Sequence, residues 1–438
     1  MTTTYWCERA ALPDGIRDGV LVVVNDQGSI GAVSTAEHAP PWAYRLAGVV
    51  LPGFANAHSH AFHRALRGRT HVDGGTFWTW RDKMYALAMR LDPDRYFALA
   101  RAVYAEMVVA GICLVGEFHY LHHAPDGSRY DDPNAMAEAL RQAALDAGVR
   151  LSLLDTCYLT GGIDTPLTPE QQRFSDGSVD AWAERVAALR GDESMLVGLA
   201  VHSVRAVSRD DLVAIGAADP RRPLHVHLSE QAAENEACLE AYGRTPAELL
   251  AETGVLSERT TAVHATHLST KDIELLGSSG TGVCFCPTTE ADLADGIGPA
   301  RELIDAGCPM SLGTDQNAVV DPLLEARALE HGERLRSGQR GRLRPAELVT
   351  TLTSAGHDSL GWTGGGRIAV GAPADLVAIR LDSPRTAGCA PDQLVLAATA
   401  ADVHAVVSRG RIVARDGRHE QLGDVGRLLS EAIEGLLA

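Results

Sequence analysis

Apolar and polar residues follow a regular pattern along most of the chain. Eight short apolar runs of strand length are separated by longer segments with apolar residues at helical spacing, as in residues 132–149 and 181–191. Strand and helix alternating eight times predict an α/β fold, a (β/α)8 barrel with parallel strands. The predicted strands lie within residues 48–60, 111–120, 150–159, 195–205, 222–230, 260–268, 282–287 and 308–316.

The two ends of the chain have a different pattern. Residues 19–34 and 403–419 are rich in strand-forming residues, with turn residues between the apolar runs. Because they lie outside the eight alternations, we expect both termini to build one small β-sandwich domain from residues 1–52 and 366–438. The barrel, residues 53–365, is then inserted into that domain.

Composition and charge narrow the possible partners. With 45% hydrophobic and 22% charged residues, the chain can form a well-packed core. A net charge of −18 opposes binding to nucleic acid, and an anionic ligand would need dedicated arginines. We find no apolar stretch of membrane-spanning length, no signal-peptide pattern and no Cys-x-x-Cys among the eight cysteines. We therefore expect a cytoplasmic protein with no membrane partner.

Histidines and charged residues gather at the predicted carboxyl ends of five strands. His58 and His60 stand one residue apart, so their side chains share a strand face and could bind one metal ion. Alone, such a pair is more often solvated or packed in a core. Further candidate residues favour the metal-binding interpretation, because the carboxyl ends of barrel strands converge on one axis. They are His202, Arg205, His225, His227, Glu230, His264, His267 and Asp315.

This set contains the donor types of a divalent-metal site with a position left open for water. We expect one ion, with Zn2+ favoured, and four ligands: His58, His60, His227 and Asp315. His225 shares a strand face with His227 and could either support the ligands or belong to the core. A second ion would need a bridging acid or lysine from the third or fourth strand, where Asp155 is available but no lysine or glutamate is. One metal is therefore the better interpretation.

The same residues could supply acid–base chemistry. A bound divalent ion lowers the pKa of water from 15.7 to roughly 7. Asp315 can accept a proton from that water, and Glu230, three residues past His227, can carry a proton to the substrate. His264 can stabilise charge that develops at the attacked carbon. The spacing supports equally well a second interpretation of Glu230, as a carboxylate at the start of the next helix with Ser229 as the cap.

Several segments resemble a known family. Similarity to the single-metal deaminase branch of the amidohydrolase superfamily rests on PGFANAHSHAFHRAL, HVHLSEQ, VHATHL and GTDQ. Similarity to the formimidoylglutamate deiminases of histidine degradation rests on FWTWRDKMY, GEFHYLHH and CPTTEADLADG. The resemblance covers the whole chain. It implies a TIM-like barrel of the amidohydrolase type with a small domain built from both termini.

The resemblance also implies roles for individual residues. The family's metal ligands fall on the four residues assigned above, and its catalytic pair falls on Glu230 and His264. Where family members often have a glutamine, this chain has His63, which can still donate one hydrogen bond to substrate. The other substrate-binding residues of the family fall on Arg81, Tyr120, His202 and Arg205.

The expected reaction is the hydrolysis of N-formimino-L-glutamate to N-formyl-L-glutamate and ammonia, catalysed by a homodimer. Arg81 and Arg205 can clamp the carboxylates of this small dicarboxylate by paired hydrogen bonds, and Tyr120 adds a donor. An alternative is a mononuclear-metal aminohydrolase for a purine, pyrimidine or triazine, against which the paired arginines and the 5% aromatic content argue. A third possibility, a scaffold protein without metal, is disfavoured because all four ligands are present.

Overall fold

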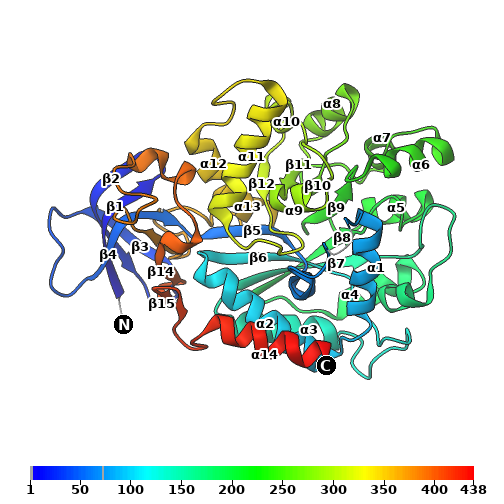
Figure 1. Cartoon of the computed structure of the whole chain (residues 1–438), viewed down its shortest axis with the longest axis horizontal. Coiled ribbons are helices and arrows are strands. Elements are labelled where there is room, and N and C mark those ends of the chain that lie inside the picture. Colours follow the sequence, from blue (N-terminus) through cyan, green and yellow to red (C-terminus); the bar gives the residue numbers. More distant parts are fainter. Residues whose placement is uncertain (1–2, 72–73) are drawn as a thin grey trace.

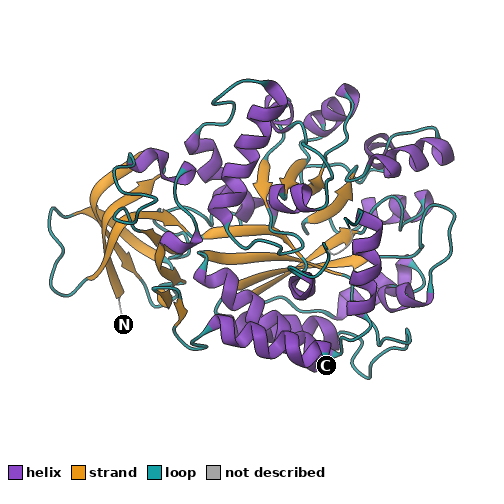
Figure 2. Ribbon diagram, viewed as in Figure 1, coloured by secondary structure: helices purple, strands orange, loops and turns teal. Residues whose placement is uncertain are grey.

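The structure is a computed structural model that describes residues 3–71 and 74–438. It has two parts, a barrel of parallel strands and a sheet built from both ends of the chain (Figure 1). Figure 2 shows helices gathered around the barrel strands, whereas strands and loops dominate the other part. The predicted fold class is confirmed.

The eight barrel strands form where the eight apolar runs predicted them. Parallel strands are covered on both faces, which explains why these runs are almost continuously apolar instead of alternating. Every residue of the eight strands is buried except Leu196. In order around the barrel, the strands are β5 (Phe54–Ser59), β6 (Ile112–His119), β7 (Arg150–Cys157), β8 (Met195–Val201), β9 (Leu224–Leu228), β10 (Thr260–His264), β11 (Gly282–Phe285) and β12 (Met310–Leu312).

The barrel closes between its last and first strands. Ser59 and Asp315 form a parallel bridge, and the backbone N–H groups of Thr314 and Asp315 donate to the His58 carbonyl at 3.1 and 2.9 Å. The Asn56 side chain reinforces this seam, because its Oδ1 accepts from the Thr314 N–H at 2.9 Å. The segments that carry the first and last predicted metal ligands therefore meet at the seam.

Helices enclose the barrel. Residues 132–149 contain α3, which ends at Gly148 in the left-handed conformation (φ +69°), where glycine is favoured. Residues 181–191 overlap α4, whose N-cap Ser178 accepts from the Ala181 N–H. Among the described residues, no helix combines the length and apolar character needed to cross a membrane. The α-helices are α1 (Phe77–Ala88), α2 (Pro93–Val109), α3 (Ala135–Ala147), α4 (Val179–Ala188), α5 (Arg209–Gly216), α6 (Ala232–Tyr242), α7 (Pro246–Glu252), α8 (Thr270–Ser278), α9 (Pro287–Asp292), α10 (Ala300–Asp305), α11 (Pro322–Ser337), α12 (Pro345–Leu352), α13 (Ser354–Ser359) and α14 (Val425–Leu437); the 3-10 helices are η1 (Ala61–Leu66), η2 (Pro169–Phe174), η3 (Pro391–Leu396) and η4 (Ala400–Asp402).

The second sheet joins the two ends of the chain. Its central strand β4 pairs with β1 in parallel and with β13 antiparallel, with Pro52 opposite Leu376 and Val49 opposite Ile379. Hydrogen bonding runs without a break in the order β16-β15-β14-β13-β4-β1-β2-β3. The strands are β1 (Thr3–Leu12), β2 (Gly15–Val24), β3 (Ile30–Thr35), β4 (Tyr44–Pro52), β13 (Leu376–Ile379), β14 (Val403–Ser408), β15 (Arg411–Arg415) and β16 (Arg418–His419).

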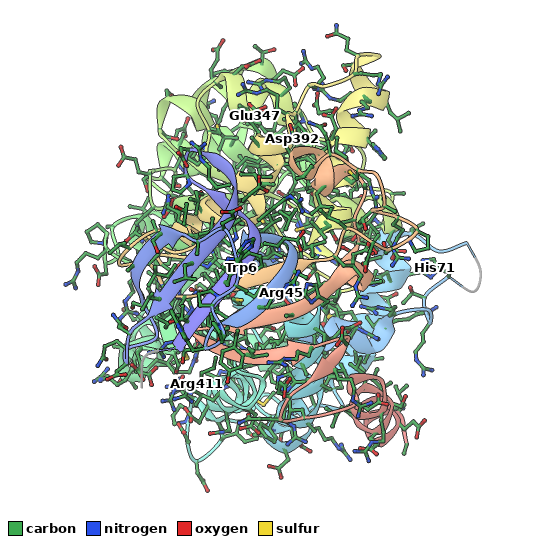
Figure 3. The ribbon with its side chains drawn as sticks, turned by 90° about the vertical axis from the view of Figure 1, so that its left-hand side faces the viewer. Trp6, Arg45, His71, Glu347, Asp392 and Arg411 are labelled. Carbon is green, nitrogen blue, oxygen red and sulfur yellow. The ribbon has the colours of Figure 1, made fainter. Side chains whose placement is uncertain are left out.

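Side-chain contacts tie the terminal segments together and to the barrel. The guanidinium carbon of Arg45 in β4 lies 5.6 Å from the ring centre of Trp6 in β1, and both residues are labelled in Figure 3. The final helix, α14, leaves the sheet and lies beside α2 of the barrel (Figure 1), where Arg90 donates to the Leu437 carbonyl at 2.9 Å. The C-terminal segment therefore contacts both parts of the molecule.

Candidate active site

The four predicted metal ligands come together at the carboxyl end of the barrel strands. The Nε2 atom of His58 lies 3.1 Å from Nε2 of His227 and 3.5 Å from Oδ1 of Asp315. The Nε2 atom of His60 lies 3.4 Å from the same oxygen of Asp315. All four side chains are buried, although they come from β5, the turn directly after β5, β9 and the segment after β12. A divalent cation can bridge nitrogen and oxygen donors arranged in this way.

Hydrogen bonds at the outer nitrogen orient two of these imidazoles. The Nδ1 atom of His60 lies 3.0 Å from the Phe118 carbonyl oxygen, and Nδ1 of His227 lies 2.9 Å from the His202 carbonyl oxygen. A carbonyl oxygen only accepts, so each Nδ1 carries the proton and each Nε2 keeps its lone pair. Two inward-facing lone pairs in a buried site beside a carboxylate fit a divalent metal ion.

The turn after β12 holds Asp315. Its backbone is left-handed (φ +45°), and the nearby Asn317 side chain donates to Ser59 Oγ at 3.3 Å and to the His60 carbonyl at 3.1 Å. Burial alone would raise the pKa of Asp315, but the hydrogen bond with His58 and the neighbouring imidazoles hold it below its usual range. Asp315 is therefore an ionised carboxylate, as a metal ligand must be.

The predicted catalytic pair lies beside the ligand group. The Nε2 atom of His264 is 3.7 Å from Oε1 of Glu230 and 3.8 Å from Oδ2 of Asp315. On the other side of the ring, Nδ1 is 3.3 Å from Oε1 of Glu290. Burial alone would lower the pKa of His264, but the carboxylates of Glu230, Glu290 and Asp315 raise it well above its usual value. His264 can therefore carry both protons and donate a hydrogen bond into the site.

Glu230 lies between a strand and a helix and lines a cavity. Helix α6 begins at Ala232 with Gln231 as its N-cap, so Ser229 does not cap it. Instead, the Ser229 N–H donates to Oε1 of Glu234 at 2.9 Å, with Ser229 in the left-handed conformation (φ +50°). Burial raises the pKa of Glu230. Of the two interpretations of this residue, the geometry favours the carboxylate that faces the cavity.

A cavity that opens to solvent leads to this group. The Nε2 atom of His63 is 2.9 Å from the Tyr120 hydroxyl, and burial lowers the pKa of His63 to about 3, so a neutral imidazole meets the phenol. All the residues that the sequence predicts to bind substrate line the cavity: His63, Arg81, Tyr120, His202 and Arg205.

The cavity wall is rich in aromatic side chains. The low aromatic content of the whole chain argued against a pocket suited to ring stacking, and that interpretation is wrong for this cavity. The few aromatic residues are concentrated here because α1, η2 and the segments after β6 and β7 each contribute some. They are Phe77, Trp80, Tyr85, Tyr120, Tyr158 and Phe174.

The two predicted substrate-binding arginines have different surroundings. The guanidinium carbon of Arg81 lies 4.5 Å from the Trp78 ring centre, and no acidic side chain pairs with it in the described part of the chain. In contrast, Nε of Arg205 lies 2.8 Å from Oε2 of Glu234, and a terminal nitrogen lies 3.8 Å from Oε2 of Glu230. Arg81 therefore contributes positive charge that no carboxylate neutralises, whereas Arg205 contributes mainly directed N–H donors.

Two residues that the sequence left open lie away from the cavity. Both oxygens of Asp155 pair with Arg185, at 2.8 and 2.9 Å, so Asp155 is not placed to bridge a second metal. The Nε2 atom of His225 is 3.0 Å from the Ser359 carbonyl oxygen, and this buried residue does not line the cavity. Its position is that of a core histidine.

Sequence reasoning missed two carboxylates that support the site. Glu290 in α9 contacts His264 and also accepts from the Cys286 N–H at 2.8 Å. Glu234 in α6 pairs with Arg205. Glu290 lies within CPTTEADLADG, but nothing in that segment distinguishes it from the neighbouring acids. Its role depends on how α9 packs against the end of β10.

Comparisons with known proteins agree with this geometry. A model of the amidohydrolase family matches residues 49–413. Formimidoylglutamate deiminase of Pseudomonas aeruginosa is 36% identical over 436 residues, which is 95% of this chain and 96% of that protein. The 8-oxoguanine deaminase of the same species is 30% identical and covers 89% of this chain and 84% of its own. A solved amidohydrolase from Brucella melitensis superposes with a TM-score of 0.90 at 30% identity, covering 100% of both chains.

Proposed function

We propose that this chain, which belongs to the amidohydrolase family and is a metal-dependent hydrolase of C–N bonds, converts N-formimino-L-glutamate and water to N-formyl-L-glutamate and ammonia. Similarity to a formimidoylglutamate deiminase along nearly the whole chain supports this substrate. The observation that carries the proposal is the unneutralised guanidinium of Arg81 in the cavity of a protein whose net charge is −18. The proposed role is a cytoplasmic step of histidine catabolism.

In this proposal, the two carboxylates of the substrate lie against the part of the cavity wall that Arg81 and Arg205 form. Arg81 binds one carboxylate and neutralises its charge. Arg205 binds the other through its terminal nitrogens, since its Nε faces Glu234. The hydroxyl of Tyr120 and the imidazoles of His63 and His202 add polar contacts along the wall. The formimino carbon is then directed toward the group of predicted ligands.

Zn2+ is the proposed ion, held by His58, His60, His227 and Asp315, and when bound it lowers the pKa of a water molecule to near 7. Water adds to the formimino carbon, and the bond to the terminal nitrogen breaks. Asp315 and Glu230 transfer protons, so that both hydrogens of the water end on the departing ammonia. His264, flanked by Glu230 and Glu290, donates a hydrogen bond that stabilises the developing charge.

One observation favours a second candidate, the deamination of a purine-like ring. The aromatic side chains around the cavity offer stacking surfaces, and an 8-oxoguanine deaminase is among the similar proteins. An uncharged ring would leave the partly buried guanidinium of Arg81 without a counter-charge, which is unfavourable. We therefore rank this function second. A metal-free scaffold is ranked lower, because the four predicted ligands come together.

The test is ammonia release by the purified, metal-loaded protein from formiminoglutamate, 8-oxoguanine, guanine and cytosine at equal concentrations. The expected result is turnover of formiminoglutamate only, with N-formylglutamate as the second product. Turnover of a ring amine without formiminoglutamate hydrolysis would support the second candidate. A purified chain that holds no metal and turns over none of the four would support the scaffold.

A further inference from the structure

Three residues that the sequence did not connect meet at the cavity wall. Gln171 of η2 donates from Nε2 to the hydroxyl oxygens of Tyr85 in α1, at 3.0 Å, and Tyr158 after β7, at 2.8 Å. Gln171 is buried, Tyr158 is 6% exposed, and both tyrosines line the cavity. One amide group therefore holds two phenols from different segments of the chain.

The orientation of the Gln171 amide is fixed by its other hydrogen bond. Its Oε1 accepts from the backbone N–H of Thr168 at 2.8 Å. An N–H can only donate, so the atom that it contacts must be the oxygen, and the atom that contacts the phenols must be the NH2 group. Both phenol oxygens consequently act as acceptors toward Gln171.

A phenol that accepts a hydrogen bond still has its own O–H hydrogen to donate. Burial raises the pKa of Tyr158, so its hydroxyl stays protonated. In the described part of the chain, neither hydroxyl has a carboxylate or carbonyl acceptor. If one phenol donates to the other, one O–H remains unused on this wall. The hydroxyl pair is therefore a donor group prepared for an acceptor in the cavity.

The guanidinium of Arg81 lies next to this pair. Its carbon is 5.6 Å from the ring centre of Tyr85 and 4.5 Å from the ring centre of Trp78. The guanidinium lies over both rings, and its N–H groups can donate to a planar anion. Positive charge and neutral O–H donors on one side of a cavity form a site suited to a carboxylate.

We propose that Tyr85 and Tyr158, oriented by Gln171, bind the same substrate carboxylate that Arg81 neutralises. This inference rests on the proposed function, because it assigns further binding residues to that substrate. Gln171 is a positioning residue, since it acts through the two phenols. The pair distinguishes a carboxylate from a carboxamide at this position, because either oxygen of a carboxylate accepts strongly from the unused hydroxyl hydrogen, whereas the NH2 group of a carboxamide does not accept.

The experiment measures kcat and KM for formiminoglutamate with Tyr85→Phe, Tyr158→Phe, the double variant and Gln171→Glu. Each single phenylalanine is expected to raise KM about tenfold, with kcat within about twofold of wild type. Gln171→Glu keeps the acceptor for Thr168 but replaces the donor by an acceptor, so the phenols turn their hydrogens away from the cavity. We expect KM to rise about 100-fold, and Tyr158→Phe to add little in that background.

The matched control is Tyr130→Phe, since the buried Tyr130 hydroxyl has no hydrogen-bond partner in the described part of the chain. It should leave KM unchanged. A second measurement uses two formimino amino acids, each lacking one of the two carboxylates. For the analogue without the carboxylate at Arg81, the effect of Tyr158→Phe should disappear, whereas a merely structural effect would persist.

The outcomes separate the two proposals. Wild-type turnover of formiminoglutamate with unchanged KM in both phenylalanine variants would overturn the hydroxyl pair and leave the proposed function standing. If Tyr158→Phe raised KM equally for both analogues that lack one carboxylate, that result would also overturn the proposed role of the hydroxyl pair. If the wild type does not turn over formiminoglutamate, the proposed function fails, and this inference fails with it.

Discussion

The Nε2 atoms of His58 and His227 lie 3.1 Å apart, although 169 positions separate the two residues in the sequence. His58 is on β5 and His227 is on β9, so the barrel itself brings them together. The carbonyl oxygen of His202 orients the His227 ring. Metal binding at this point should therefore depend on individual imidazoles of a rigid frame.

Replacing His227 by asparagine should abolish metal binding. Loss of an outer partner of a ligand typically weakens metal affinity or activity 10- to 100-fold, so loss of a ligand should reduce activity by more than about 100-fold. Elemental analysis of the dialysed protein gives the metal content. His225→Asn is the matched control on the same strand, and it should retain about one ion per chain. If the control loses the ion and His227→Asn keeps it, the ligand assignment is wrong.

Glu290→Gln should reduce kcat about 10- to 100-fold with little change in KM or metal content. The reason is that Glu290 orients His264 at 3.3 Å and helps keep it protonated. Steady-state kinetics and metal analysis on the same sample provide the check. Glu274→Gln, at an exposed position of α8, serves as the control and should behave as wild type. An unchanged kcat in Glu290→Gln would remove Glu290 from the catalytic group.

The two cavity arginines should respond differently to replacement by methionine. Arg81→Met should raise KM for formiminoglutamate by about 10- to 100-fold and leave thermal stability close to wild type, because no acid is left unpaired. Arg205→Met should also raise KM, and in addition it should lower the free energy of unfolding by about 3 kcal/mol, because it leaves buried Glu234 without its partner.

The double variant Arg205→Met/Glu234→Gln separates these two effects. It should recover most of the lost stability in thermal unfolding, since the unpaired charge is gone, but not the affinity for substrate. Recovery of both would mean that Arg205 only balances the charge of Glu234. Recovery of neither would indicate that the arginine fills space that methionine cannot.

Glu325 in α11 should make stability depend on pH. It accepts from the Thr288 N–H at 2.9 Å, and burial raises its pKa to about 8. The folded state then holds a proton that the unfolded chain releases above a pKa near 4.3. Its stabilising contribution is complete below that value and is lost as pH rises toward about 8, at roughly 1 kcal/mol per pH unit.

The glutamine side chain of Glu325→Gln has nearly the same shape as glutamate but does not titrate. In urea unfolding, its stability relative to wild type should therefore increase between pH 5 and pH 8 and level off above. Metal content should stay constant across this series, which excludes ion loss as the cause. A difference between variant and wild type that does not vary with pH would show that Glu325 is ionised in the folded protein at neutral pH.

The barrel and the predicted ligand group could be anticipated from the sequence because both follow from local rules. Continuous apolar runs identify buried parallel strands, and residues after such runs lie at one end of a barrel. His58, His60 and Asp315 follow that rule. Glu290, Glu234 and Gln171 do not, because each acts across two packed elements. Glu290 is 26 positions from its partner His264, and Glu234 is 29 positions from its partner Arg205. Gln171 is 86 positions from one of its tyrosine partners and 13 from the other. The periodicity of a helix or strand does not predict contacts at these separations.

The sequence does not show how the surroundings of the two cavity arginines differ. Arg81 and Arg205 look equivalent as two arginines near aromatic or histidine residues, but only the fold shows that Glu234 faces one of them. The aromatic content of the chain likewise gave no information about where the rings gather. Average composition describes the whole molecule, whereas a binding cavity is lined by a few residues from each of several segments.

The seam between β12 and β5 has a consequence for biosynthesis. His58 and His60 leave the ribosome early, but the bridge from Ser59 to Asp315 can form only after more than 250 further residues have been synthesised. A nascent chain truncated before that point has an open sheet and an incomplete set of donors. The full set of predicted ligands can therefore come together only after the segment that follows β12 has been synthesised, with the helices α11 to α14 and the strands β13 to β16 still to follow.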